Sequence, residues 1–342
     1  MRFSFGAVVA GLLLALAAAA TAGLALGSVR IPVADVLEIL GGGADPSPFR
    51  TIVLDVRLPR VLLGAVVGAG LAVIGTVLQA LVRNPLADPF LLGVSSGASA
   101  GAVVVIVLGS AFGLGAGLAT TVTIPAAAFA GALFSLALVY ALARAGGNFA
   151  TGRLILAGVA VSYILSALTS LILVTADSAD HLKEVLYWTL GGLGSARWDM
   201  LALPAGVLLV GTALLVALAR PLDLLLVGEE GATVLGLDTA RFRAAVFVLA
   251  SLLTGVLVAY SGAIGFVGLM VPHAARMLVG AAHRALLPVA ALMGAVFLVA
   301  ADLAARTVAA PQDIPVGVLT ALTGGPFFLW LLRGSRSGEA VI

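Results

Sequence analysis

Long apolar stretches alternate with short polar segments along all 342 residues of the chain. A helix that crosses the roughly 30 Å hydrocarbon core of a bilayer needs about 20 apolar residues. Ten stretches approach this length, at roughly 6–27, 60–82, 91–110, 118–143, 154–175, 200–219, 244–261, 264–280, 285–305 and 314–332. The polar segments between them are too short to form a soluble domain of ordinary size. The pattern therefore predicts an all-α integral membrane protein with about ten transmembrane helices, which form one membrane-embedded domain over residues 1–342.

Two parts of this pattern are less regular. The two spans within 244–280 are interrupted by Gly262, Gly265, Gly268 and Pro272. At the N-terminus, Arg2 followed by a run of Leu and Ala resembles a secretory signal peptide. Nine further spans follow, which favours a first helix that is not cleaved.

The composition agrees with a membrane location. Apolar residues make up 62% of the chain and charged residues only 10%, against about 25% charged residues in soluble domains. The chain has no cysteine, which excludes disulfides and thiolate metal sites. Its three histidines, His181, His273 and His283, are far apart and form no ligand cluster, so no metal site is predicted.

The distribution of charge predicts an orientation. Cytoplasmic loops of membrane proteins carry an excess of Lys and Arg. Most of the 18 Lys and Arg residues lie on the cytoplasmic side if both termini are placed in the cytoplasm. The chain is accordingly expected in the cytoplasmic (inner) membrane. Arg57, Arg60 and Arg306 then lie outside, against the rule. They either extend toward lipid headgroups or form a docking surface for an acidic partner, whereas Asp302 is expected to pair with Arg306 at i, i+4.

A polar break separates the second and third spans. Residues 83–90 read Arg-Asn-Pro-Leu-Ala-Asp-Pro-Phe, and two prolines with Asn and Asp force a tight break between helices. Small residues at four-residue spacing flank it, Gly64 with Gly68 and Gly93 with Gly97. Such spacing lets helix backbones approach closely in lipid.

The segment 221–243, called the coupling segment below, is too short and too polar to cross the membrane. It follows an inward-going span and is therefore expected in the cytoplasm. Glu230-Gly231-Ala232, with Gly236 four residues further on, predicts a short helix, a glycine turn and a second short helix. The segment is interpreted as a surface lid, as a lever that fits a groove on another protein, or as a solvated loop.

The fifth span carries a mildly polar stripe. Ser162, Ser166 and Ser170 fall at i, i+4 and i+8, with Thr169 beside them, on an otherwise apolar helix. Two interpretations stay open, interhelical packing of the hydroxyl groups and the lining of a path for a bulky ligand.

Two further stretches complete a family resemblance. Residues 265–273 read Gly-Phe-Val-Gly-Leu-Met-Val-Pro-His, and Ile314-Pro315-Val316-Gly317 starts the last span. Together with the Arg-Leu-Pro-Arg entry at 57–60 and the break at 83–90, they resemble the permease subunit of iron–siderophore, haem and cobalamin ABC importers, the FecCD-like type II permeases. The resemblance runs from about residue 55 to 333.

This resemblance implies the fold of the cobalamin-importer permease, with ten helices per subunit. It also implies a second permease copy or a homologous permease around a central path, two cytoplasmic ABC ATPases and an extracytoplasmic substrate-binding protein. The fifth and tenth helices resemble those that line the path. The site residues implied are Glu229, Glu230, Gly231, Ala232 and Gly236 for ATPase coupling; Arg57, Arg60 and Arg306 for binding-protein docking; Thr151 and Gly152 for the cytoplasmic gate; and Ser162, Ser166, Thr169, Ser170, Thr320 and Thr323 for the path.

The chain lacks the parts of an enzyme. A P-loop needs a glycine-rich turn before its lysine, and the single lysine, Lys183, has none. ATP and Mg²⁺ are therefore expected in partner subunits, with no cofactor bound by this chain. Ionisable residues within the spans are scarce, with Asp302 and His273 as the nearest candidates, which counts against an ion-coupled secondary transporter and an intramembrane enzyme.

The expected function is passage of a metal chelate into the cytoplasm by alternating access, driven by separate ATPases. Ferric siderophore is the first choice of cargo because it is the commonest in this class, and haem and cobalamin stay open. Membrane lipid is the remaining expected partner, and no nucleic acid is expected to bind.

Overall fold

The computed structural model describes residues 4–43, 48–109, 122–144, 151–176 and 179–334. Within these ranges the secondary structure is helical and contains no strand. The prediction of an all-α membrane protein is confirmed. The first residues of the predicted span 118–143 lie outside the described ranges.

Each of the ten predicted spans contains one apolar helix. Seven described helices are long and apolar enough to cross a membrane, and three apolar helices are shorter. The two spans within 244–280 are separate helices joined by residues 262–266. The ten are α1 (Phe5–Ala25), α4 (Leu58–Val82), α5 (Val94–Leu108), α6 (Ile124–Arg144), α7 (Thr151–Val174), α9 (Ala202–Ala217), α12 (Thr239–Ser261), α13 (Val267–Val279), α14 (His283–Thr307) and α15 (Val316–Gly334).

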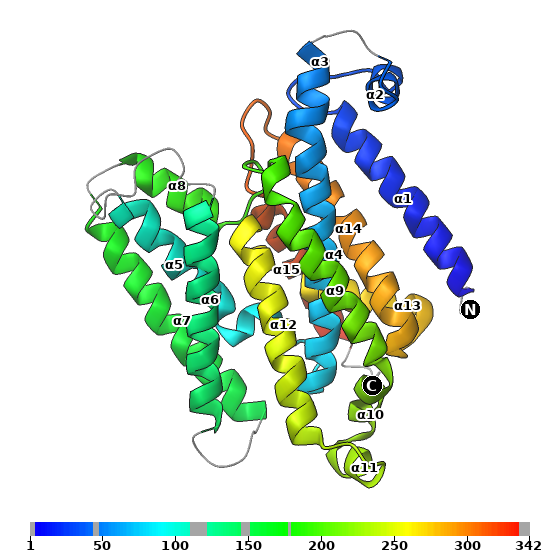
Figure 1. The fold of residues 1–342 in the computed structure, drawn as a ribbon, viewed down its shortest axis with the longest axis vertical. Coiled ribbons are helices and arrows are strands. Elements are labelled where there is room, and N and C mark those ends of the chain that lie inside the picture. Colours follow the sequence, from blue (N-terminus) through cyan, green and yellow to red (C-terminus); the bar gives the residue numbers. More distant parts are fainter. Residues whose placement is uncertain (1–3, 44–47, 110–121, 145–150, 177–178, 335–342) are drawn as a thin grey trace.

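Short helices gather at the two ends of this bundle (Figure 1). At the upper end in Figure 1, called the α2 end, lie α2 (Val33–Leu40), α3 (Pro48–Thr51) and α8 (Ala179–Thr189), and a π-helical turn (Ile52–Arg57) continues α3 into α4. At the opposite end, called the α11 end, lie α10 (Ala219–Val227) and α11 (Glu229–Val234).

The central helix is α4, which packs against α12, α13 and α14. Its contact with α14 is a crossing of two glycines. A Cβ on Gly68 would clash with the carbonyl oxygen of Gly294, and a Cβ on Gly294 would clash with that of Gly68. Gly75 meets the backbone of Gly268 on α13 in the same way. Backbones approach this closely in lipid only where side chains are small, so the predicted role of Gly68 is confirmed.

A second group of helices, α5, α6 and α7, lies beside this centre (Figure 1). The backbones of α5 and α6 touch at Gly97 and Gly131, where a Cβ on either residue would clash with the other residue's carbonyl oxygen. Gly93 begins α5 with a φ of +75°, a conformation that favours glycine. Gly64, by contrast, faces side-chain methyl groups of Leu193 and Val299 and no backbone of another helix.

Candidate functional site

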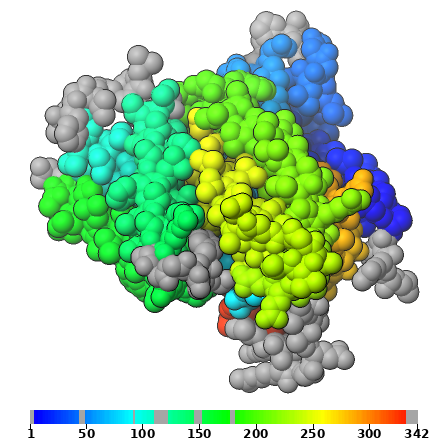
Figure 2. Space-filling view, turned by 60° about the horizontal axis from the view of Figure 1, so that its bottom comes forward, coloured from blue at the N-terminus to red at the C-terminus, as the bar shows by residue number. Residues whose placement is uncertain are grey.

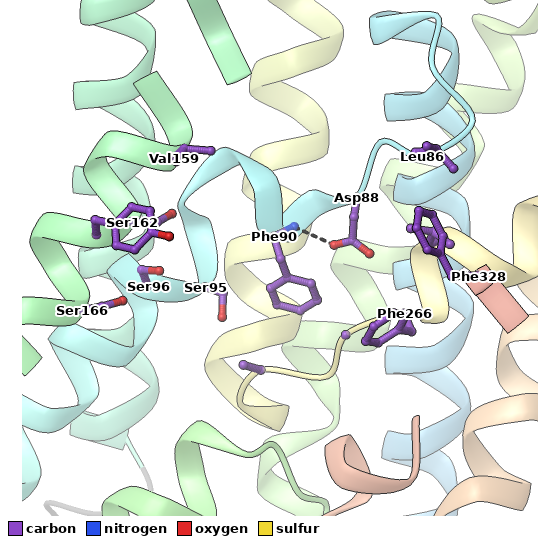
Figure 3. Close-up of a pocket in the computed structure, with 14 residues that line it drawn as sticks. Leu86, Asp88, Phe90, Ser95, Ser96, Val159, Ser162, Ser166, Phe266 and Phe328 are labelled. Atoms are coloured by element: carbon purple, nitrogen blue, oxygen red, sulfur yellow. Dashed lines mark hydrogen bonds between the residues drawn. The ribbon is translucent and has the colours of Figure 1, made fainter. Parts of the chain in front are cut away.

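A cavity of about 940 Å³ lies where the two helix groups face each other (Figure 3). Its walls come from five parts of the chain: the polar break, the start of α5, one face of α7, the 262–269 region and α15. The lining residues are Leu86, Asp88, Phe90, Ser95, Ser96, Val159, Ser162, Tyr163, Ser166, Ala263, Gly265, Phe266, Leu269 and Phe328.

The polar break keeps its shape through two local hydrogen bonds. The side-chain oxygen of Asn84 accepts from the N–H of Leu86 at 2.9 Å. The carboxylate of Asp88 accepts from the N–H of Phe90 at 2.8 Å and so begins a 3-10 turn, η2 (Pro89–Leu92). Asn and Asp commonly satisfy backbone groups in this way at turns, which irregular backbone inside a membrane protein requires. The predicted break between helices is confirmed.

The cavity wall is aromatic and hydroxylated. Phe266 and Phe328 lie on one side, Ser95, Ser96 and the α7 serines lie on the other, and Phe90 lies between them (Figure 3). None of the lining residues is a His, Cys or Met, the usual soft and borderline metal ligands. Such a wall can hold the organic exterior of a ligand, but it offers only one carboxylate to a bare metal ion.

That carboxylate belongs to Asp88, which lies in the break outside both flanking helices. Burial raises the pKa of Asp88 from its ordinary 3.8 to about 6, and the hydrogen bond from Phe90 opposes this rise. Asp88 is therefore ionised at neutral pH, and the described ion pairs give it no cationic partner.

The predicted path residues divide into two sets. Ser162 and Ser166 line the cavity. Thr169 and Ser170 instead bond carbonyl oxygens of their own helix, and Thr320 and Thr323 do the same on α15. The tenth span contributes Phe328 to the cavity wall. Phe328 is aromatic, and the path residues were predicted from polar side chains alone.

The predicted gate residues lie at the start of α7. Gly152 is exposed, and a Cβ added there would meet nothing within 4 Å. The side chain of Thr151 and residues 145–150 lie outside the described parts of the chain. The gate role stays a prediction.

At the α2 end Arg60 and Arg306 pair with two aspartates, and Arg57 binds backbone carbonyls beside them. This arginine cluster comprises Arg57, Arg60, Arg306, Asp302 and Asp313. The Arg60 guanidinium donates from Nε to both carboxylate oxygens of Asp302, at 3.0 and 3.1 Å, and from an Nη to Asp313 at 2.7 Å. Arg306 pairs with Asp302 at 3.0 Å, so the predicted i, i+4 pair is confirmed.

The cluster also binds the end of the first helix. Arg306 donates to the carbonyl of Gly23 at 3.1 Å, and Arg57 donates to the carbonyls of Leu24 and Val29 at 2.6 and 2.5 Å. Arg57 and Arg306 are only 5% and 6% exposed. The charge pattern of the sequence predicts these side chains on a surface. The structure instead buries two of the three and gives each of them partners within the chain, because they satisfy carbonyls and carboxylates where α1, α4 and α14 meet. Their docking role stays a prediction.

At the α11 end the coupling segment is built as helix, turn and helix. Gly228 separates α10 from α11, and Gly236 (φ +89°) separates α11 from α12, whose first turn is capped by the Asp238 carboxylate. The predicted second short helix is thus the beginning of a transmembrane helix rather than a helix of its own.

The coupling segment lies at the surface of the molecule (Figure 2), and several of its apolar side chains are exposed. Val234 is 87% exposed, and Val227 and Leu235 are exposed beside it. Glu230 is exposed as well, whereas Ala232 is fully buried. Ala232 therefore packs inside the segment, and its coupling role stays a prediction.

The fold is thus a bundle of apolar helices around a cavity lined by aromatic and hydroxyl-bearing residues. The chain belongs to the FecCD transport family, whose family model matches residues 12–334.

Named relatives transport several metal chelates. The cobalamin import system permease protein BtuC of Halobacterium salinarum is 48% identical over 288 residues, which cover 84% of this chain and 75% of that protein. The hemin transport system permease protein HmuU of Yersinia pestis is 45% identical over 289 residues, which cover 83% of this chain and 85% of that protein. The Fe(3+) dicitrate transport system permease protein FecD of Escherichia coli is 37% identical over 96% of this chain and 99% of that protein.

A solved structure of a metal-chelate type ABC transporter in an inward-facing conformation has a similar fold. It is 33% identical, with a TM-score of 0.83 over 96% of this chain and 99% of that chain. The protein is therefore a multi-pass membrane permease of a type II ABC importer for metal chelates. Permeases of this family are not enzymes, because a separate subunit hydrolyses ATP, and they act with ATPase and substrate-binding partners.

Proposed function

We propose that this permease carries a ferric siderophore, held by its organic shell, through the cavity between α7 and α15 by alternating access. The observation that supports this most is the cavity wall itself, with its aromatic rings, hydroxyl groups and single carboxylate. Pockets of this kind bind ligands through apolar contact and a few placed polar groups. A metal that enters such a cavity must already be coordinated by its chelator.

Haem and cobalamin are the alternative cargoes. The relatives at 48% and 45% identity are named for cobalamin and hemin, and FecD is named for ferric dicitrate. The cavity residues of this chain suit the organic surface of any of these chelates, so the cargo has to be decided by transport measurements.

The assembly we infer is a homodimer, or a pair with a homologous permease, in the cytoplasmic membrane with both termini in the cytoplasm. The exposed apolar residues of the coupling segment support a protein partner at the α11 end, because exposed apolar patches mark interaction sites. That partner is the ATPase pair, which binds ATP and Mg²⁺. The binding protein docks at the α2 end.

An ion-coupled mechanism is less well supported by the same residues. Asp302, the best carboxylate for such a role, is held by both Arg60 and Arg306. His273 lies edge-on to the ring of Phe327. Neither group has the free, hydrated position that a proton carrier needs.

The test is reconstitution of the full complex in proteoliposomes with a panel of binding proteins loaded with siderophore, haem or cobalamin. We expect one loaded binding protein to stimulate ATP hydrolysis and cargo uptake. Ser166→Trp should block uptake because it fills the cavity, whereas Ala167→Trp, one residue along α7 and outside the cavity lining, is the matched control. Equal uptake in both variants would remove the cavity from the proposed path.

A further inference from the structure

The carboxylate of Glu229 takes part in an ion pair within the chain. Glu229 is the first residue of α11, and it pairs with the guanidinium of Arg243, 14 residues further on in α12. The Arg243 side chain is 5% exposed and that of Glu229 is 51% exposed. The ion pair therefore joins α11 to α12 across the Gly236 turn, from a half-exposed position on one side to a buried one on the other.

Arg243 depends on this pair for its neutralisation. Two of its other nitrogens, Nε and Nη2, are buried without a hydrogen-bond partner among the described residues. The described ion pairs give Arg243 no acidic partner other than Glu229. A buried cation that loses its counter-charge is strongly disfavoured, so the pair holds the first turn of α11 in one position.

The same turn lies close to the side chain of Arg83, the first residue of the cavity-lining break. Gly228, just before α11, has a φ of +111°, and a Cβ added there would lie 3.7 Å from Nη1 of Arg83. Arg83 ends α4 and begins the break whose residues Leu86 and Asp88 line the cavity. Gly228 therefore lies close to the tip of the Arg83 side chain, and the preceding helix, α10, packs against α4, the helix that leads into the break.

The preceding helix has its own attachment. The Asp223 carboxylate of α10 accepts from the N–H of His283 at 2.9 Å, and the same oxygen lies 2.6 Å from Nδ1 of that ring. His283 is the first residue of α14. The coupling segment is therefore held at two points, α10 on α14 and α11 on α12, with Gly228 between them.

We propose that Glu229 is a positioning residue, which fixes α11 to Arg243 so that movement of the coupling segment reaches the break at Arg83. It acts through this ion pair, whereas Glu230 and the exposed apolar residues of α11 meet the ATPase. This inference rests on the proposed function, and it assigns to Glu229 a different role from the direct ATPase contact that the family resemblance implies.

The experiment uses the absence of native cysteine in the chain. Spin labels at Thr233→Cys on α11 and Ala245→Cys on α12 report the distance between the two helices in the full-length permease in nanodiscs. The variants are Glu229→Gln, Arg243→Gln and the double reversal Glu229→Arg with Arg243→Glu. Glu230→Gln is the matched control, because it removes the neighbouring exposed carboxylate from the same helix.

We expect a broader label distance distribution in both single variants and a return to the parent distribution in the double reversal. ATP-dependent uptake should fall about tenfold or more in the single variants and recover in the reversal, with ATPase association retained throughout. Glu230→Gln should leave the distances unchanged and weaken ATPase association instead.

Unchanged distances in Glu229→Gln, or a reversal that behaves like the single variants, would overturn the proposal. Because Arg243 is buried, its variants can fail to fold; Glu229→Gln and Glu229→Asp, at a half-exposed position, then decide the matter alone. The label distances need no partner subunit. If they change as expected while the parent complex transports without ATP, the ion pair stands and the proposed function fails.

Discussion

The two ends of this permease differ in which side chains they bury and which they expose. At the α2 end, Arg60 and Arg306 pair with Asp302 and Asp313, and Arg57 and Arg306 donate to carbonyls at the end of α1. Little of Arg57, Asp302 or Arg306 is exposed. At the α11 end, the coupling segment leaves apolar side chains such as Val234 uncovered outside the membrane spans. The difference indicates that charge is used to hold helices together at one end, and that exposed apolar surface is kept for a partner at the other.

The largest expected effect is the loss of the arginine cluster. Asp302→Ala leaves the buried Arg306 without its carboxylate and removes one of the two partners of the partly buried Arg60, and we expect about 3–5 kcal/mol of lost unfolding free energy. Denaturant unfolding in detergent measures this loss. Asp199→Ala removes an exposed pair with Arg197 at 3.6 Å and should cost less than about 1 kcal/mol. Similar losses in the two variants would contradict the structural role of the cluster.

The next effect concerns the opposite end. Val234→Asp places a charge in the exposed apolar face of α11, and we expect ATPase association to weaken by about 30-fold or more, the size of a hot-spot loss near 2 kcal/mol. The unfolding free energy should not change. Leu37→Asp, on the exposed face of α2, is the control and should leave ATPase association intact. A destabilised Val234→Asp protein would show that the face is buried in the fold.

A smaller effect distinguishes Asp88 from Asp302, because Asp88 has no described cationic partner. Its folded pKa of about 6 lies above its ordinary 3.8, so ionisation costs the folded state. The cost is absent near pH 4, grows as the pH rises to about 6 and is constant above that. The rise in pKa from 3.8 to about 6 corresponds to about 3 kcal/mol. Because Asp88 is only partly buried, we expect Asp88→Asn to stabilise the protein by roughly 1–2 kcal/mol at pH 7.5 and hardly at all at pH 4. Unfolding measured at both pH values tests this, and an equal effect at both would refute the assignment.

The smallest effect tests docking at the cluster. Asp313 is the exposed partner of Arg60, with its side chain 44% exposed. If an acidic group of the binding protein meets Arg60, Asp313→Asn removes a competitor and should tighten docking by about two- to fivefold at low salt. The gain should vanish at about 1 M salt, where charges are screened within about 3 Å. Unchanged affinity would leave Arg60 with its internal role only.

Local patterns predicted much of this architecture. The ten spans, the break at 83–90 and the close contacts of Gly68 and Gly97 follow from residue types at short spacing. The pair Asp302–Arg306 was predictable because both residues lie on one face of one helix. Each of these features depends only on neighbours within a few turns.

Contacts between distant segments were not predictable in this way. Arg60 meets Asp302 and Asp313 across 242 and 253 residues, and no local pattern indicates those partners. The aromatic wall of the cavity likewise depends on how α15 lies against the break. The family resemblance implies that Glu229 faces the ATPase, whereas the Gly236 turn brings it onto Arg243.

Our central claim is that this permease moves its cargo only when nucleotide-driven partners act on the coupling segment. The most direct measurement is uptake of labelled chelate into proteoliposomes that hold either the complete complex or the purified permease alone. The account predicts uptake by the complex with ATP and Mg²⁺ at the α11 end, and none by the permease alone under a proton or sodium gradient. Gradient-driven uptake by the purified permease without nucleotide would contradict it.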